Sequence, residues 1–371
     1  MTVMKVPYVD LGAQWRDIRE VVLARIDEVL SSGMYLEHHL VEKLEDQLAT
    51  MLNIKGCVML NSGTDALILA MHALGIRRGD EVITVPNSFI ASVAAIEHIG
   101  AKTQLVDVGP DHLIDVDAVE AAITSKTVAV MPVHLEGKMC DMSRLSEICA
   151  RRGLLLIEDA AQAISSSFQG NSPGFGSNAA CFSLHPLKNL NACGDSGFVA
   201  SNDANLIKLL RQLRNHGQSE RNRVTRFGVV SRMDSLQAVV VSERLRLLGE
   251  VVRKRVRNAA AYNFHLSQTP IIQLPIVERG VNHSYHLYVI EVNNRDVLIE
   301  QLAEQGIETR IHYPLLISDQ PAFVEKYGLI SSQFPNAVKQ AKKILSLPIH
   351  QHLSNFQIEF VASQLVRFID N

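Results

Sequence analysis

The 371-residue chain contains no apolar run of the ~18 residues that a membrane-spanning helix needs. Its first residues, MTVMKVPYVDLGAQW, also lack the apolar core of a secretory signal peptide. No internal repeat, low-complexity segment or long linker interrupts the sequence. We therefore expect a globular protein that acts in the cytoplasm and has no membrane partner.

The chain also has few cysteines and no long run of like charges. The five cysteines are odd in number and lack the paired spacing of a disulfide framework or a metal site, so we expect reduced thiols and no metal. They are Cys57, Cys140, Cys149, Cys181 and Cys193. The net charge is -3, and no block of like charge suggests a nucleic-acid partner. The short run Arg253–Lys254–Arg255 is interpreted as a solvated helix face.

The first half of the chain alternates between short apolar runs and helical periodicity. The apolar runs occupy residues 57–60, 81–85, 102–108, 127–133, 153–159 and 180–184. The helical patterns occupy residues 65–74, 90–99, 116–123 and 142–151. This alternation predicts an α/β domain whose mostly parallel central sheet lies between helices.

The pattern changes beyond residue 202. Helical patterns cover residues 204–216, 235–266, 297–304, 336–344 and 355–369, and apolar runs lie between them, as at 285–292. We expect a smaller C-terminal α+β domain that follows a long connecting helix. The predicted division is 1–245 for the large domain, with its N-terminal helix, and 246–371 for the small one.

Ligands bind at the carboxyl ends of the strands in open α/β sheets, so the residues that follow each strand are informative. In NSGTDAL (61–67), Gly63 allows backbone N–H groups to approach an anion, and the Thr64 hydroxyl can add a bond. A plain helix cap is the alternative. Asp159 ends a central strand, where a buried carboxylate needs a partner; a cap is again the alternative.

Lys188, in FSLHPLKN (182–189), follows the next strand. A buried amine is costly unless it is paired or covalently used, whereas an exposed loop lysine needs no explanation. An anion cradle, a carboxylate and a lysine together are what pyridoxal phosphate requires. A nicotinamide enzyme would need a Gly-x-Gly-x-x-Gly turn, which the first half lacks.

Motifs along nearly the whole chain resemble one known family. They include NSGTDALILAMHALGIRRGDEVITVPNSFIAS, PVHLEGKMCDM, IEDAAQA, FSLHPLKNLNACGDSG, SRMDSLQA, GIETRIHYP and LSLPIH, in that order. By these motifs the chain is identified as a member of the DegT/DnrJ/StrS family of sugar aminotransferases. The resemblance implies a fold-type I enzyme that depends on pyridoxal phosphate and forms a homodimer with shared active sites.

The resemblance also implies roles for individual residues. Lys188 matches the lysine that binds the cofactor covalently and shifts the proton, and Asp159 matches the carboxylate that pairs with the pyridine nitrogen. Further cofactor contacts are implied for Gly63, Thr64, Phe89, Gln162 and Ser183. Candidate substrate contacts are His185, Asn191, Arg221, Arg223, Arg226, His312 and Tyr313. The three arginines lie in a segment expected to cross to the neighbouring subunit.

Three positions depart from the family pattern. Val230 stands where an asparagine usually reaches the cofactor phosphate of the neighbouring subunit, so that hydrogen bond is expected to be missing. Glu136 replaces an aromatic residue, and HPLKNLNA places His185 and Asn191 near the lysine. These changes affect the substrate and the phosphate contacts, and they leave the transamination residues intact.

The implied reaction transfers an amino group, with L-glutamate as the expected donor, to a nucleotide-linked keto deoxyhexose. The IHYP run (311–314) resembles members that aminate C3, with C4 as the second choice. The product would serve surface polysaccharide or glycosylated metabolite synthesis. The alternatives are a sugar dehydratase, whose relatives carry histidine at the lysine position, and a regulatory protein that would have lost Lys188 or Asp159.

Overall fold

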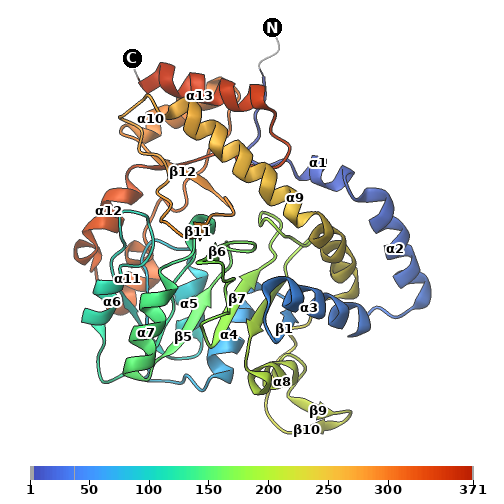
Figure 1. Cartoon of the computed structure of the whole chain (residues 1–371). Helices are drawn as coiled ribbons and strands as arrows, with labels where there is room; N and C mark the ends of the chain where they lie inside the picture. Colours follow the sequence, from blue (N-terminus) through green and yellow to red (C-terminus); the bar gives the residue numbers. More distant parts are fainter. Residues whose placement is uncertain (1–3, 37, 370–371) are drawn as a thin grey trace.

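A seven-stranded sheet forms the centre of the larger part of the molecule, in the order β1-β8-β7-β5-β4-β2-β3 (Figure 1). The computed structural model describes residues 4–36 and 38–369. The strands are β1 (Gly56–Leu60), β2 (Glu81–Thr84), β3 (Lys102–Leu105), β4 (Thr127–Val130), β5 (Leu155–Asp159), β7 (Ala179–Ser183) and β8 (Gly197–Ser201). Neighbours pair in parallel except at β8, which runs antiparallel to β1 and β7. The prediction of a mostly parallel sheet is confirmed, although the apolar pattern does not predict β8.

Helices cover both faces of this sheet because successive strand residues point to opposite sides. One face buries Val58 of β1 under α4 (Gly63–Ala73) and α8 (Ala204–Leu213), and Val82 of β2 under α5 (Ala91–His98). The other face buries Cys57 and Met59 of the same strand under α3 (His38–Leu52) and α9 (Ser235–Leu266). Further along this second face lie α6 (Val116–Ala122) and α7 (Met142–Arg152).

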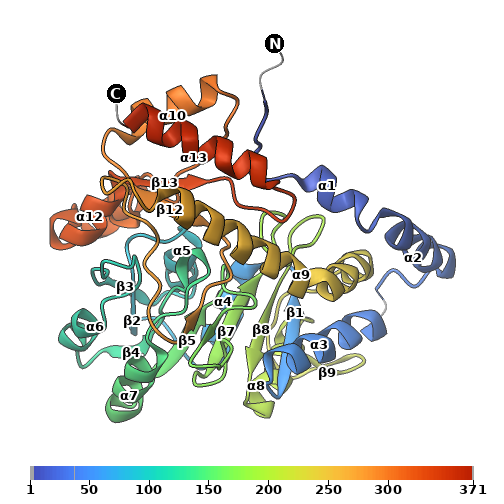
Figure 2. The same ribbon diagram turned by 45° about the horizontal axis from the view of Figure 1, so that its top comes forward.

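A second, smaller core lies at the C-terminal end of the chain. The antiparallel strands β12 (Tyr288–Glu291) and β13 (Ile344–Leu347) pack with α10 (Arg295–Glu304), α13 (Asn355–Ile369) and the end of α9 (Figure 2). The predicted α+β character of this part is confirmed. The helix predicted over 336–344 is shorter: α12 (Pro335–Ala341) ends early because Ile344 begins β13 and pairs with Glu291.

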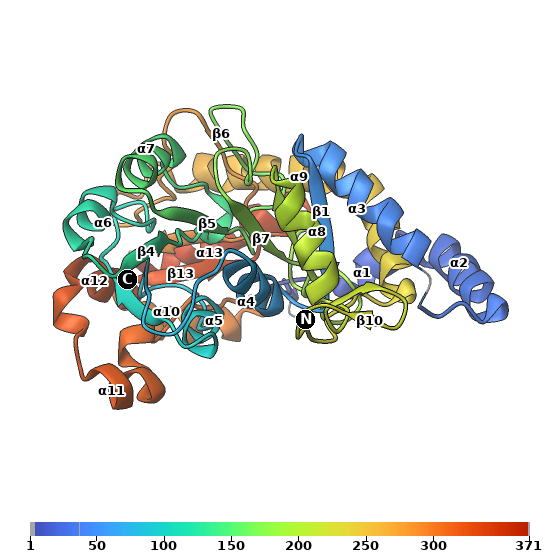
Figure 3. The ribbon, with the colours of Figure 1, turned by 90° about the horizontal axis from the view of Figure 1, so that it is seen from below.

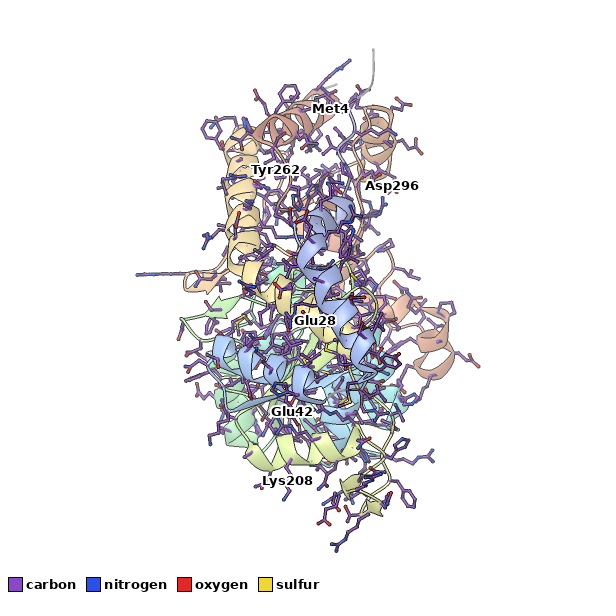
Figure 4. All side chains as sticks on the ribbon, turned by 90° about the vertical axis from the view of Figure 1, so that its right-hand side faces the viewer. Met4, Glu28, Glu42, Lys208, Tyr262 and Asp296 are labelled. Carbon is purple, nitrogen blue, oxygen red and sulfur yellow. The ribbon has the colours of Figure 1, made fainter. Side chains whose placement is uncertain are left out.

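The N-terminal segment joins this smaller core before it reaches the large sheet. Val6 forms a β-bridge with Ile307, and Met4 packs in the same cluster as Tyr262. Figure 4 shows Met4 and Tyr262 at one end of the molecule and Lys208 of α8 at the other. The helices α1 (Leu11–Arg16) and α2 (Arg19–Ser32) then lead back toward α3.

The long helix α9 connects the two cores and runs without a break through residue 245. The division into 1–245 and 246–371 therefore stays a prediction. Seen from below, α2 and α3 lie at one end of the molecule, and α12 lies with α11 (Pro321–Tyr327) at the other (Figure 3). These last two helices pack on the cluster of α6 and α7, which ties the C-terminal part to the large sheet.

Within residues 4–36 and 38–369, no helix is long and apolar enough to cross a membrane. In the same ranges, no group of three or more His, Cys, Asp and Glu side chains is arranged to hold a metal ion. All five cysteines are free, and Cys193 is exposed.

Candidate active site

A cavity of about 460 Å³ opens at the carboxyl edge of the sheet, between the two cores. Ten of the predicted site residues line it: Gly63, Thr64, Phe89, Asp159, Gln162, Ser183, His185, Lys188, His312 and Tyr313. They come from the ends of β5 and β7, from the segments that follow β1, β2, β5 and β7, and from the segment between α10 and α11. The rule that ligands meet the carboxyl ends of strands therefore predicts the place of the cavity correctly.

The start of α4 forms one wall and is built for close backbone approach. The Ser62 side chain accepts a hydrogen bond from the N–H of Asp65 and so caps the helix. A Cβ on Gly63 would lie 2.7 Å from the Cβ of Ser183, and one on Gly197 would lie 2.5 Å from the backbone of Ser62. Both positions therefore exclude a side chain. Gly63 and Thr64 of the helix start line the cavity, where the N-terminus of a helix favours an anion.

Lys188 and Asp159 face the same cavity from neighbouring strands. Burial lowers the pKa of Lys188 to about 8, and the negative charge of Asp159 opposes this fall. Asp159 is buried and accepts hydrogen bonds from the Ser92 hydroxyl at 2.7 Å and from the Ala161 N–H at 3.1 Å. The Lys188 amine has no acceptor among the described residues, so it is available to a ligand in the cavity.

Aromatic and amide side chains complete the wall beside Asp159. The rings of Phe89 and Tyr313 lie 5.7 Å apart, and Phe89 is 55% exposed, so its face is open to the cavity. Gln162 donates to the Tyr313 hydroxyl at 3.3 Å and accepts from the Glu136 N–H at 2.6 Å. Burial and then the Lys188 charge lower the pKa of His312 to about 4, so this imidazole is neutral near pH 7.

His185 also lines the cavity, on the exposed loop that precedes Lys188. Its Nδ1 accepts a hydrogen bond from the Leu187 N–H at 3.3 Å. Burial and then the charge of Lys188 lower its pKa, which favours a neutral ring.

Four candidate substrate residues are not brought to this cavity. Asn191 is buried behind the Lys188 loop, where its amide donates to Gln14 at 3.0 Å and to the Pro186 carbonyl. Arg221, Arg223 and Arg226 lie in or beside the exposed hairpin of β9 (Gln218–Glu220) and β10 (Arg223–Val224). Val230 is 51% exposed and forms a bridge with Asn215, outside the cavity lining.

Sequence reasoning missed six polar residues of the lining: Tyr8, Ser62, Asp195, Ser196, Arg255 and His286. The interpretation of 253–255 as a solvated face is wrong for Arg255, which is only 4% exposed. A signal was present, because Ala259 and Tyr262 follow Arg255 at helical spacing and are buried on the same face of α9.

Comparison with known proteins agrees with this arrangement. The model of the DegT/DnrJ/EryC1/StrS aminotransferase family matches residues 16–366. The erythromycin biosynthesis sensory transduction protein EryC1 of Saccharopolyspora erythraea is 39% identical over 98% of this chain and 99% of its own length. The UDP-2-acetamido-2-deoxy-3-oxo-D-glucuronate aminotransferase of Pseudomonas aeruginosa is 34% identical over 97% of this chain and 99% of its own.

Solved structures give the same result. DesV of S. venezuelae, in complex with a ketimine intermediate, superposes with a TM-score of 0.96 at 37% identity and covers 99% of both chains. NtdA of Bacillus subtilis, with bound cofactor PMP, gives a TM-score of 0.92 at 32% identity and covers 100% of this chain and 86% of its own. The chain therefore belongs to the DegT/DnrJ/EryC1/StrS aminotransferase family and is a pyridoxal phosphate-dependent sugar aminotransferase of fold type I.

Proposed function

We propose that this enzyme transfers the amino group of L-glutamate to C3 of a nucleotide-linked keto deoxyhexose, with C4 as the second choice of carbon. The IHYP run and the similarity to the 3-oxo sugar aminotransferase of P. aeruginosa support C3. The product serves surface polysaccharide or glycosylated metabolite synthesis. The five free cysteines support a cytoplasmic location.

The observation that carries this proposal is one cavity that holds Lys188, Asp159 and the open start of α4. Gly63 and Thr64 line the cavity at the N-terminus of α4, and this helix start fits the phosphate of pyridoxal phosphate. We assign the phosphate to Gly63, Thr64 and Ser183, the covalent bond to Lys188, and the pyridine nitrogen to Asp159. The face of Phe89 supports the ring, and Gln162 lies near the ring hydroxyl.

The cofactor, when bound, accepts the electron pair released at the substrate carbon. Lys188 moves the proton at that carbon. With a pKa near 8, a useful fraction of its Nζ is uncharged near neutral pH and can take the proton of the amino donor. The same Nζ returns a proton to the sugar carbon in the second half of the reaction. Ser92 and the Ala161 N–H fix the direction of the Asp159 carboxylate throughout.

We further propose a homodimer with shared active sites. The exposed hairpin supports this, because Phe227 is 98% exposed and Val224 is 54% exposed beside Arg223 and Arg226. Apolar side chains with so much exposed area favour contact with another surface. The arginines of the same segment then reach the diphosphate of a sugar nucleotide in the partner's cavity.

Two other functions were considered from the sequence. A sugar dehydratase would keep the cofactor cradle, but its relatives carry histidine where Lys188 stands. A regulatory role is suggested by the name of EryC1 as a sensory transduction protein. Such a role requires neither Lys188 nor Asp159, yet both line the cavity beside an intact cradle. Transamination accounts for all three features, so we favour it.

The test is to incubate the enzyme with L-glutamate and a panel of 3-keto and 4-keto sugar nucleotides, and to identify products by mass spectrometry. We expect an amino sugar from a 3-keto substrate and none from the Lys188→Ala variant, because no other residue supplies the covalent anchor and base. Loss of water from the sugar without gain of nitrogen would support the dehydratase. No reaction with any member of the panel would contradict the proposal.

A further inference from the structure

The wall of the cavity opposite the large sheet carries polar side chains whose hydrogen-bonding capacity the described residues do not fully satisfy. Arg255 comes from the middle of α9, Tyr8 from the N-terminal segment, and His286 from the chain just before β12. All three side chains line the cavity, and none belongs to the cradle at the start of α4. Three donors drawn from separate parts of the chain at one wall indicate a built site.

Arg255 is the charged member of this group. Its Nη1 donates to the carbonyls of Tyr285 at 2.9 Å, His286 at 3.3 Å and Ile349 at 2.8 Å. Among the described residues, Nε is buried without an acceptor, and no carboxylate pairs with the guanidinium. A buried cation without a counter-ion is unfavourable, so an anionic ligand at this wall would stabilise it.

Tyr8 lies close enough to Arg255 for their charges to interact. Burial raises the pKa of the Tyr8 hydroxyl, and the Arg255 charge opposes the rise, so the hydroxyl keeps its proton and remains a donor. The Ser346 side chain also lowers this pKa as a hydrogen-bond partner, and no other partner meets the Tyr8 oxygen among the described residues. The ring of Tyr8 stacks on that of His312 at 5.9 Å, which holds the hydroxyl in place.

His286 adds a neutral ring to the same wall. Burial, then the charges of Lys188 and Arg255, hold its pKa well below the usual range. Its Nδ1 is buried without a partner in the described part of the chain. A neutral imidazole donates one N–H, so the wall offers a guanidinium, a hydroxyl and an N–H to an acceptor.

We propose that Arg255, Tyr8 and His286 form a carboxylate-binding subsite of the aminotransferase. A carboxylate is a pure acceptor that matches the fork of an arginine, and the remaining donors of the wall can serve the same group. The cavity's own acids, Asp159 and Asp195, both belong to the large domain, and neither pairs with Arg255. The acid must therefore come from a substrate.

Two substrates can supply this carboxylate. One is the amino-acid donor, and the other is a sugar acid, the class named for the P. aeruginosa relative. The subsite rests on the proposed function, because that function requires the amino-acid donor and the sugar to enter this cavity. It is nevertheless testable when no sugar product is found, because the donor's half of the reaction needs no sugar.

The experiment compares Arg255→Met and Tyr8→Phe with the matched control Arg253→Met, an exposed arginine of the same helix. The cofactor's absorbance change with L-glutamate gives the apparent affinity for the donor. Calorimetry with glutarate, a dicarboxylate that cannot react, measures binding alone. We expect Arg255→Met to weaken both by about 10- to 100-fold and Tyr8→Phe by about 3- to 10-fold, with no change in the control.

Arg255 also supports three carbonyls, so Arg255→Lys and the melting temperature of each variant are measured in parallel. If the weakening appears with glutamate and glutarate, the carboxylate is the donor's. If it appears only with a keto sugar acid nucleotide and not with its neutral counterpart, the carboxylate is the sugar's. Either result supports the subsite. Unchanged affinity for all these acids in a folded Arg255→Met variant, or equal weakening for the neutral sugar, would overturn it.

Discussion

Asp159 is oriented before any ligand arrives. The Ser92 hydroxyl at 2.7 Å and the Ala161 N–H at 3.1 Å fix both carboxylate oxygens, and the side chain is only 5% exposed. A carboxylate held in this way places a negative charge at one point of the cavity at no cost of reorganisation during the reaction. The role that we propose for Asp159, to pair with the cofactor ring through both halves of transamination, requires a charge fixed in this way.

The first prediction at this scale concerns Asp159→Asn. An amide of the same shape cannot hold the pyridine nitrogen protonated, so we expect the proton transfer to slow by about 100-fold or more while the cofactor stays bound. Stopped-flow absorbance with L-glutamate measures the rate, and the absorbance of the purified variant measures cofactor content. Ser92→Ala, which removes one orienting bond, should cost less. Near-normal turnover of Asp159→Asn would contradict the role.

At the scale of elements, β8 explains which site residues the sequence could predict. Residues after the parallel strands, such as Lys188 after β7 and Asp159 at the end of β5, are found by looking at strand ends. Because β8 runs antiparallel, its beginning lies at that same edge, and Asp195 and Ser196 precede it there. A search after strands therefore misses them. No helix precedes the strand, so no alternation of strand and helix marks it.

Contacts between distant elements were beyond sequence reasoning for a different reason. Tyr8 reaches the cavity only because Val6 pairs with Ile307, and His286 because its segment crosses to the large domain. No periodicity in the sequence encodes either contact. The burial of Arg255 was not predicted, because the adjacent Arg253 and Lys254 suggested a solvated face. Burial depends on the face of the helix that a residue occupies and not on the charge of its neighbours in sequence.

The start of α4 gives a prediction about an element. In Gly63→Ala, the new Cβ would lie 2.7 Å from the Cβ of Ser183, so the helix start and β7 must separate. The backbone N–H groups would then point away from the phosphate, and we expect the dissociation constant of the cofactor to rise about 10-fold or more. Fluorescence titration of the cofactor-free protein measures it. Gly176→Ala, where a Cβ meets nothing within 4 Å, is the control. Equal affinity in the two variants would show that the cradle does not bind the phosphate.

The molecule as a whole depends on a buried group of charges where the two cores meet. Glu136 accepts from His112 at 2.6 Å and pairs with Lys138 at 2.9 Å, and the other His112 nitrogen lies 3.1 Å from Glu291 of β12. Two acids and two bases thus balance each other across the joint. The departure at Glu136 from the usual aromatic residue has a structural reason here, because it supplies one of the acids. The Glu136 N–H also donates a hydrogen bond to the Gln162 side chain, which lines the cavity, so the joint is in contact with the cavity wall.

This joint predicts how stability depends on pH. Burial opposes the charged form of His112, but Glu136 and the hydrogen bonds to both acids outweigh it and raise the pKa to about 9, from an ordinary 6.5. A pKa that is higher in the folded state adds stability below pH 6.5, and this contribution is lost as the pH rises through 9. The difference corresponds to roughly 3 kcal/mol. We expect the melting temperature of the holoenzyme to fall between pH 6.5 and 9.5.

The control variants separate His112 from other titrating groups. His112→Gln keeps a polar side chain of similar size but carries no charge, so it should be less stable at pH 6.5 and should lose most of the decline toward pH 9.5. His98→Gln changes an exposed histidine of α5 and should keep the slope of the parent. Scanning fluorimetry of the three proteins at five pH values is sufficient. If His112→Gln melts with the same pH slope as the parent, the imidazole is neutral in the folded protein.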